Sequence, residues 1–377
     1  MSLTPFPEPI YVTKPILPDL DALKERLEDT WSSRVLTNVG PRHRELEQRL
    51  LGELKVPGLC LFNNGTIGLI TACQALRLSG EVITTPFTFP ATPHVLAWNG
   101  ITPVFCDIEP ETMNLDPEKI ESLITSRTTG ILGVHVYGKP CAVDAIDDIA
   151  KRHGLRVIYD AAHAFGVEMD GRGIGTCGDI SMFSFHATKL FHTIEGGCVT
   201  FNDPHLKPRI ELLKNFGIKN ENEVILPGIN GKLNELQCAV GLLNLAELDA
   251  ERARRQQIEN LYRERLGRIP GITLPKQDER IRSSHQYFTI RIDAGRYGIT
   301  RDELHARLKE FNVVTRKYFF PLCSDYPCYR NLPSSRPELL PVARRTVTEV
   351  LVLPMYGQLG LGDVSMICDL IETRCAR

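Results

Sequence analysis

Short apolar runs alternate with helix-like segments through the first half of the chain. The runs read as β-strands and comprise LCLFN, EVITT, PVFCD, ILGVHVY, RVIYD, SMFSF and CVTF. A helical stripe between two of them is formed by Val143, Ile146, Ile149 and Ala150, and Gly154 follows as a C-cap. Because strands that alternate with helices form a sheet covered on both faces, the pattern predicts an α/β domain with a mostly parallel central sheet.

The pattern changes after about residue 240. The stretch VGLLNLAELDAERARRQQIENLYRERLGRI predicts one long amphipathic helix that leaves the sheet and leads to a second unit. HQYFTIRID, TRDELHARLKEF and VLVLP then predict a smaller α+β domain. We expect an N-terminal arm and first helix over residues 1–35, a large α/β domain over residues 36–245 and a small C-terminal domain over residues 246–377.

The composition is that of a globular protein. The 377 residues are 42% hydrophobic and 24% charged, and the net charge of −2 argues against a general attraction to nucleic acid. No apolar run reaches the roughly 20 residues that span a bilayer, and the N-terminus lacks the apolar core of a signal peptide. Eleven cysteines without a CxxC pair favour free thiols in a reducing compartment. We therefore expect a cytoplasmic protein with no nucleic-acid or membrane partner.

A candidate anion seat lies in NNGTIGLITACQAL, where a strand turns into a helix. The first N–H groups of a helix lack intrahelical partners and favour negative charge, so Gly65 and Thr66 are candidates for holding a phosphate group. An ordinary helix N-cap explains the same residues. The segment lacks GxxxxGK[ST] and is therefore not a nucleotide P-loop.

Asp160 ends the predicted strand RVIYD, at the sheet edge where open α/β folds bind ligands. A carboxylate there could bind a metal, a ribose or a protonated ring nitrogen, or it could only cap a turn. GRGIGTCG, over residues 171–178, resembles a dinucleotide fingerprint, but no amphipathic helix follows it. It is better explained as a glycine-rich hairpin loop.

SFHATKLFHTIEGG carries the most informative residue, Lys189. Its histidines lack the spacing of zinc ligands, so we expect no metal site. A lysine after a buried strand suits a Schiff base, since an apolar pocket lowers its pKa. Pyridoxal phosphate would use Ser184 as a further phosphate anchor, Asp160 at the ring nitrogen and Phe89 on the ring face.

Together, the segments NGT, PFTFPAT, YDAAHAFG, FSFHATKLFHTIEGG and PGINGKLNELQCAVG resemble the DegT/DnrJ/EryC1/StrS family. These are nucleotide-sugar aminotransferases of fold type I that use pyridoxal phosphate, and the resemblance covers nearly the whole chain. It implies that Lys189 binds the cofactor covalently and shuttles a proton. It also implies a homodimer with shared active sites.

The resemblance implies roles for further residues. Gly65, Thr66 and Ser184 would bind the phosphate of the cofactor. Asp160 would pair with the pyridine nitrogen, Phe89 would stack on the ring, and His163 would lie beside it. Asn230 would contact the phosphate from the neighbouring subunit. The family often reads N-x-R-M from this asparagine. Here Lys232 replaces the arginine, which puts a bidentate contact in doubt.

The likeness also bears on the substrate. KLFHTIEGG and TRKYFFPL resemble members that aminate C4 of a 4-keto-6-deoxy sugar, with Arg316 and Tyr318 on the substrate side and Asn38 near the diphosphate of a dTDP carrier. L-Glutamate is the implied amino donor, and a surface polysaccharide such as O-antigen is the implied destination. Alternatives are amination at C3, a UDP or GDP carrier, and a non-catalytic regulator. Relatives that dehydrate sugars replace the lysine with histidine, so Lys189 argues against that activity.

Overall fold

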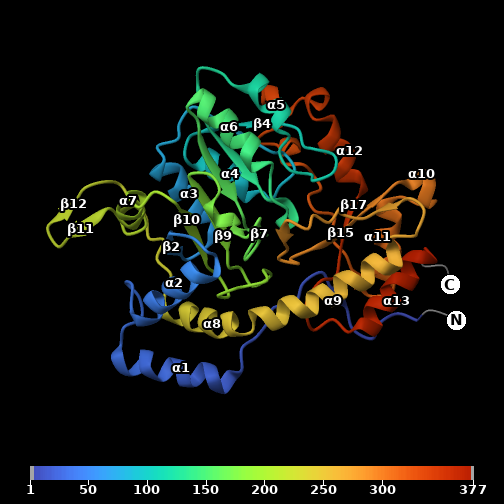
Figure 1. Ribbon diagram of the computed structural model, residues 1–377, viewed down its shortest axis with the longest axis horizontal. Coiled ribbons are helices and arrows are strands. Elements are labelled where there is room, and N and C mark those ends of the chain that lie inside the picture. Colours follow the sequence, from blue (N-terminus) through green and yellow to red (C-terminus); the bar gives the residue numbers. More distant parts are fainter. Residues whose placement is uncertain (1–3, 375–377) are drawn as a thin grey trace.

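A seven-stranded sheet forms the centre of the computed structural model, which describes residues 4–374 (Figure 1). In spatial order the strands are β2 (Gly58–Phe62), β10 (Gly197–Phe201), β9 (Ile180–Ser184), β6 (Arg156–Asp160), β5 (Thr128–Val134), β3 (Glu81–Thr84) and β4 (Thr102–Phe105). Every neighbouring pair is parallel except the two that β10 makes. All seven apolar runs contribute strands, which confirms the predicted α/β fold.

Helices cover both faces of this sheet. One face carries α2 (Pro41–Glu53), α6 (Val143–His153) and α8 (Glu235–Ala246), and the other carries α3 (Gly65–Ala75), α4 (Ala91–Trp98) and α7 (Leu206–Leu213). The predicted stripe of α6 is buried, and Gly154 ends this helix with a φ of 63°. A residue in that left-handed conformation satisfies the last carbonyls of a helix, so the predicted C-cap is confirmed.

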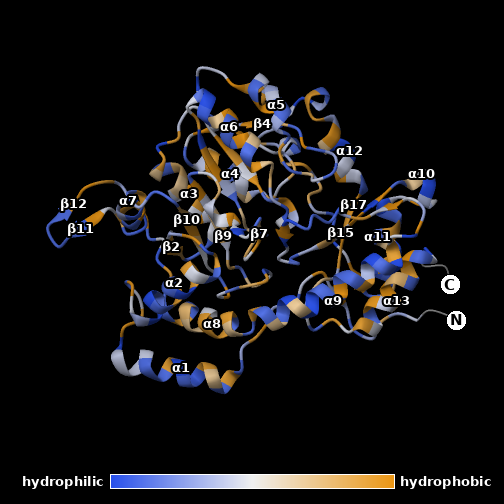
Figure 2. Cartoon of the chain, in the orientation of Figure 1, coloured by the Kyte–Doolittle hydropathy of each residue, from blue (hydrophilic) through white to orange (hydrophobic). Residues whose placement is uncertain are grey.

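A second core lies in the C-terminal part. Its antiparallel sheet comprises β13 (Ile272–Thr273), β15 (Phe288–Ile292) and β17 (Val350–Leu353), and its helices are α9 (Leu248–Leu266), α11 (Arg301–Glu310), α12 (Pro341–Glu349) and α13 (Leu361–Glu372). Apolar and polar residues alternate along α9 and α13 (Figure 2), as expected for helices with one buried face. The α+β pattern agrees with the prediction, and the exact domain boundaries stay predictions.

The N-terminal segment contacts both parts of the molecule. Its short strand β1 (Ile10–Tyr11) pairs in parallel with β16 (Val313–Val314), so the arm packs on the C-terminal part. Helix α1 (Leu20–Ser33) follows and lies against α8. The remaining short helices are α5 (Pro117–Ile120) and α10 (Ala294–Tyr297).

The prediction of one long connecting helix is wrong. Helix α8 begins earlier, at Glu235, and a break at Glu247 separates it from α9. The amide of Glu247 bonds to the carbonyl of Asn244, a tightened i→i−3 turn. The apolar spacing continues across the break. However, α8 packs on α2 and α1 whereas α9 packs on α13, so the direction of each helix is set by different packing partners.

Two hairpins leave the main sheets. The strands β7 (Glu168–Met169) and β8 (Arg172–Gly173) form a hairpin, and β7 also pairs with β14 (Ile281–Arg282), which confirms a hairpin at the start of the glycine-rich stretch. Residues Ile174–Thr176 then form a 3-10 turn. The hairpin of β11 (Ile218–Asn220) and β12 (Glu223–Val224) projects from the body of the molecule (Figure 1).

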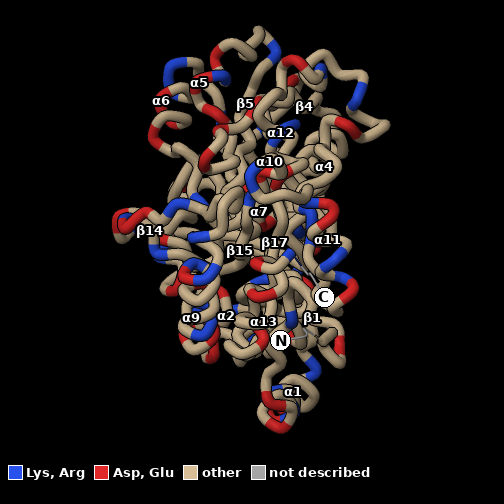
Figure 3. Tube along the Cα trace, turned by 90° about the vertical axis from the view of Figure 1, so that its right-hand side faces the viewer, with Lys and Arg blue, Asp and Glu red and all other residues tan. Residues whose placement is uncertain are grey.

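Charged side chains of both signs are interspersed along the trace (Figure 3), consistent with the balanced composition. Within residues 4–374, no helix has both the length and the apolar character needed to cross a membrane.

Candidate active site

The carboxyl ends of β6 and β9 open into a cavity of about 700 Å³. It is lined by nine of the residues that the sequence singled out: Gly65, Thr66, Phe89, Asp160, His163, Ser184, Lys189, Arg316 and Tyr318. Parallel strands end at the same edge of a sheet, which is why residues far apart in the chain meet here. The two remaining candidates, Asn38 and Asn230, do not line this cavity.

A close backbone approach shapes the anion seat at the start of α3. The side chain of Asn64 caps the helix by accepting a hydrogen bond of 2.8 Å from the amide of Ile67. A Cβ atom on Gly65 would lie 2.7 Å from the sulfur of Met182 and 3.3 Å from Cβ of Ser184. The seat therefore requires glycine, and it places the Ser184 side chain beside the free N–H groups of the helix. This cradle fits a phosphate group.

Asp160 is held in a fixed orientation at the end of β6. It is 5% exposed, and its carboxylate accepts hydrogen bonds from the Thr92 hydroxyl at 2.8 Å and the Ala162 amide at 3.0 Å. Burial raises the pKa of this carboxyl group above its ordinary value, although the two hydrogen bonds and the charge of Lys189 oppose the shift. A buried carboxylate of this kind stabilises a cation brought close to it.

Lys189 lies in the loop between β9 and β10. Burial lowers the pKa of its amine to about 8, although the charge of Asp160 opposes the shift. The amine lies 6.0 Å from the centre of the Tyr287 ring. A lysine with this pKa is partly uncharged near neutral pH, which is the form that attacks a carbonyl carbon or accepts a proton.

The loop that carries Lys189 is fixed by Gln286. The side-chain oxygen of Gln286 accepts a hydrogen bond of 2.6 Å from the amide of Leu190, and its nitrogen donates one of 3.0 Å to the carbonyl of Thr188. Gln286 is buried. It therefore clamps the residues on both sides of the lysine.

His163 packs in a stack of rings beside Asp160. Its ring is parallel to those of Tyr137 and Phe319, at centroid distances of 6.4 and 6.0 Å. Burial holds the pKa of His163 well below its usual value, and the charge of Lys189 lowers it further. The amide of Tyr137 donates to Nδ1 of His163 at 3.3 Å, so the proton of the neutral imidazole lies on Nε2.

Phe89 is 54% exposed, although the neighbouring Phe87 is fully buried. Its carbonyl accepts a hydrogen bond of 3.1 Å from the amide of Thr92, so one short segment carries both Phe89, which lines the cavity, and the buried Thr92 hydroxyl that holds Asp160. An aromatic face exposed at a cavity rim suits stacking on a flat ring.

Arg316 and Tyr318 enter the cavity from the C-terminal part. Backbone hydrogen bonds of 3.1 and 2.8 Å tie Arg316 to Val352 of β17. The Tyr318 carbonyl accepts a hydrogen bond of 2.5 Å from the Tyr137 hydroxyl. The C-terminal part is therefore joined to the large sheet directly at the cavity.

Asn230 and Asn38 lie outside the cavity in this single chain. The carbonyl of Asn230 accepts a hydrogen bond of 3.4 Å from the side chain of Asn63. Asn38 lines a separate pocket of about 230 Å³ together with Lys214 and Lys232. Their predicted roles therefore require a surface other than the cavity of their own chain.

Sequence reasoning missed Thr92, Gln286 and Tyr287. Thr92 lies three residues after Phe89 in the segment PFTFPAT, so its position next to a candidate residue could have identified it. Gln286 and Tyr287 precede a strand of the C-terminal part, and nothing local marks them. Within residues 4–374, no group of three or more His, Cys, Asp or Glu residues is arranged to hold a metal ion.

The chain is similar to known proteins over almost its whole length. Residues 20–372 match the DegT/DnrJ/EryC1/StrS aminotransferase family. The chain is 46% identical to dTDP-4-amino-4,6-dideoxy-D-glucose transaminase of Escherichia coli, over 96% of this chain and 98% of that protein. It is 32% identical to GDP-perosamine synthase of Caulobacter vibrioides, over 93% of this chain and 94% of that protein.

A solved structure agrees with these matches. The crystal structure of DesI in the presence of its TDP-sugar product superposes with a TM-score of 0.94 at 39% identity, covering 99% of this chain and 95% of that one. The family match and the relatives extend over almost the whole chain. The protein belongs to the DegT/DnrJ/EryC1/StrS aminotransferase family.

Proposed function

We propose that this aminotransferase moves the amino group of L-glutamate to C4 of dTDP-4-keto-6-deoxy-D-glucose, giving dTDP-4-amino-4,6-dideoxy-D-glucose. The observation that carries the proposal is one cavity that holds a lysine of lowered pKa, Lys189, beside the buried carboxylate of Asp160. The name of the Escherichia coli relative and the sugar product of the DesI structure support the substrate.

The cofactor that we propose is pyridoxal phosphate. When bound, it supplies a ring that draws electrons from the carbon that loses or gains a proton. Gly65, Thr66 and Ser184 would hold its phosphate, and Asp160 would keep the ring nitrogen protonated. Phe89 and His163 would flank the ring. The neutral imidazole of His163 adds no positive charge next to that nitrogen.

Lys189 has two tasks in this proposal. Its neutral amine would hold the cofactor covalently, and once free it would accept a proton from the α-carbon of glutamate. In the second half-reaction the same amine would carry a proton from the C4′ position of the cofactor to C4 of the sugar. The clamp of Gln286 on Thr188 and Leu190 limits where the amine can reach.

On the substrate side, we assign Arg316 and Tyr318 to the wall that the sugar contacts. Asn38 and Asn230 would act on the cavity of a second copy, the first near the nucleotide diphosphate and the second at the cofactor phosphate. Exposed apolar side chains support a homodimer, since they gather on the projecting hairpin and its flanks: Phe216, Ile218, Val224, Ile225 and Ile229. All ten described cysteines are free, which supports the proposed cytoplasmic location.

Incubation with L-glutamate, pyridoxal phosphate and dTDP-4-keto-6-deoxy-D-glucose tests this function. We expect 2-oxoglutarate and a sugar whose new amine NMR places on C4. An amine on C3 would refute the regiochemistry and leave the aminotransferase intact. Cofactor binding without turnover of any keto sugar would instead favour a non-catalytic regulator.

A further inference from the structure

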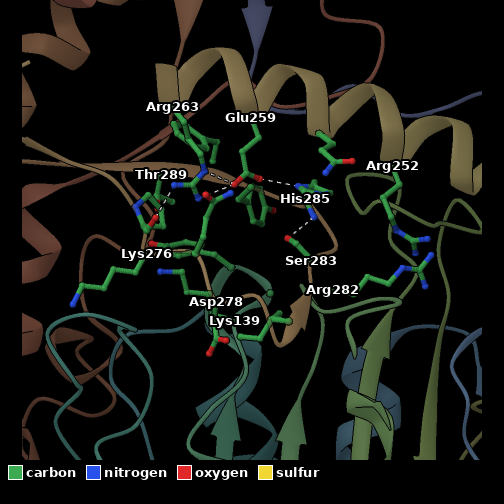
Figure 4. A pocket seen from close by; sticks show the side chains of 18 of the residues that line it. Lys139, Arg252, Glu259, Arg263, Lys276, Asp278, Arg282, Ser283, His285 and Thr289 are labelled. Carbon is green, nitrogen blue, oxygen red and sulfur yellow. Dashed lines mark hydrogen bonds and ion pairs between the residues drawn. The ribbon is translucent and has the colours of Figure 1, made fainter. Parts of the chain in front are cut away.

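A second cavity, of about 720 Å³, lies between α9 and the turn that follows β5 (Figure 4). Residues 275–289 form one wall, Lys139 lies at its floor, and Arg252, Glu259 and Arg263 descend from α9. Lys189 and Asp160 do not line it. Tyr287 lines both cavities and so forms part of the partition between them.

Three of the acidic side chains that line this cavity are already paired. Glu259 accepts a hydrogen bond of 2.8 Å from Nε of Arg263 and lies 2.7 Å from Nδ1 of His285. Nearer the rim, Asp278 is bound by Arg280 and Asp249 by Arg252. The carboxylates at these three positions are thus engaged by cations of their own.

Lys139 differs from these paired groups. Its amine makes no hydrogen bond or ion pair with any residue between 4 and 374, whereas its backbone is fixed by a hydrogen bond of 3.0 Å to Val136 and one of 3.1 Å from Asn114. Burial lowers the pKa of this amine to about 8 and the nearby charge of Arg263 lowers it further, although the charges of Glu259 and Glu111 oppose the shift. An unpaired cation held in a recess is costly unless a ligand supplies the missing charge.

Arg252 provides a second, independent indication of a ligand site in this cavity. It is 7% exposed, and its Nε and Nη2 atoms are buried without a hydrogen-bond partner among the described residues. Its guanidinium has only Asp249 at 2.9 Å and the more distant Glu53 at 3.6 Å as acidic neighbours, and Asp249 is shared with Arg282. Arg252, which lines the cavity, therefore retains donor groups that the described residues do not satisfy.

We propose that this second cavity binds a small organic molecule through a carboxylate or phosphate group, with the amine of Lys139 as the anion contact. An oxyanion accepts charge-assisted hydrogen bonds and would supply the acceptor that the ammonium of Lys139 lacks, whereas Arg263 is already engaged by Glu259 and by the carbonyl of Pro275. The cavity volume lies in the range of binding sites for small molecules and is larger than a bare ion would fill, so the ligand has an organic part in addition to its anionic group. This inference does not depend on the proposed function.

Calorimetric titration of the cofactor-loaded protein tests the site. Sulfate is the first probe because it does not titrate near neutral pH, and glycerol phosphate and succinate then separate phosphate from carboxylate ligands. We expect saturable binding that Lys139→Met weakens by roughly tenfold or more, because a charge-assisted contact is lost. Lys139→Arg should retain most of the affinity, and the exposed Lys151→Met on α6 should match the wild-type protein.

Proton uptake provides a readout that a merely structural role of Lys139 would not give. Near pH 8 the free amine is about half neutral, so binding of an anion should draw in a fraction of a proton. Titrations in two buffers of different ionisation enthalpy measure this uptake, which Lys139→Met should abolish. The proposal is overturned if no probe binds at millimolar concentrations, or if the folded Lys139→Met protein binds as the wild type does.

Discussion

The hydroxyl of Thr92 donates a hydrogen bond of 2.8 Å to Oδ2 of Asp160, and Thr88 lies 2.8 Å from the same hydroxyl. All three side chains are buried. Because the other oxygen, Oδ1, accepts a hydrogen bond from the amide of Ala162, the two contacts together fix the orientation of the carboxylate at the cavity. Thr92 is therefore a positioning residue for Asp160.

Replacing Thr92 with valine should weaken binding of pyridoxal phosphate. Valine preserves the shape but removes the donor, which further raises the pKa of Asp160 and weakens its hold on a protonated ring nitrogen. A hydrogen bond to a charged group contributes about 1.5–3 kcal/mol, so we expect the dissociation constant to rise by roughly tenfold or more. Spectrophotometric titration measures it. Thr92→Ser, which keeps the hydroxyl, should bind nearly as well as the wild type, and equal affinities for Thr92→Val and the wild type would contradict the assignment.

Replacing Lys189 with methionine should stabilise the cofactor-free protein at neutral pH. The folded-state pKa of about 8 lies below the ordinary lysine value of 10.5, so the unfolded chain binds more protons between these values and stability rises with pH there. The wild-type penalty is full below pH 8 and disappears above pH 10.5. We expect the free energy of unfolding to be about 1–3 kcal/mol higher in the variant at pH 7, with a difference that shrinks towards pH 10. Urea unfolding of both proteins measures this difference. A difference that does not change with pH would mean that Lys189 is not desolvated.

The same variant should lose the visible absorption band of the lysine-linked cofactor and all transaminase activity. Its far-ultraviolet circular dichroism should match that of the wild type, because the substitution leaves the sheet intact. Lys151→Met on α6, an exposed lysine paired with Asp147, is the matched control and should keep the band.

Replacing Gln286 with alanine should loosen the loop around Lys189. The substitution removes an acceptor for Leu190 and a donor for Thr188, leaving buried backbone groups without partners at a cost of about 1–3 kcal/mol each. We expect a lower melting temperature and a reduced kcat, with a smaller change in KM, because the amine no longer rests in one position. An unchanged kcat in the folded variant would show that the clamp has no part in catalysis.

The sequence predicted the sheet and much of the cavity for a clear physical reason. Each buried strand is a short apolar run, and the ends of parallel strands share one edge, so the positions of Asp160 and Lys189 followed from local pattern and the resemblance. Gln286 is different, since it meets Leu190 across 96 residues and the contact exists only once the C-terminal part has docked. The break at Glu247 was missed because the apolar spacing runs through it unchanged.

Replacing Gly65 with alanine should damage the phosphate seat selectively. The added methyl group would lie 2.7 Å from the sulfur of Met182 and 3.3 Å from Cβ of Ser184, so either the Met182 side chain or the start of α3 must shift, and Ser184 is crowded as well. We expect weaker binding of pyridoxal phosphate and little change for pyridoxal, which lacks the phosphate. Gly68→Ala in the same helix is the matched control, since its methyl group would meet Val199 at 3.3 Å and has no part in the seat. If both variants bind pyridoxal phosphate equally well, the first turn of α3 does not hold the phosphate, and the seat must be sought elsewhere along the cavity wall.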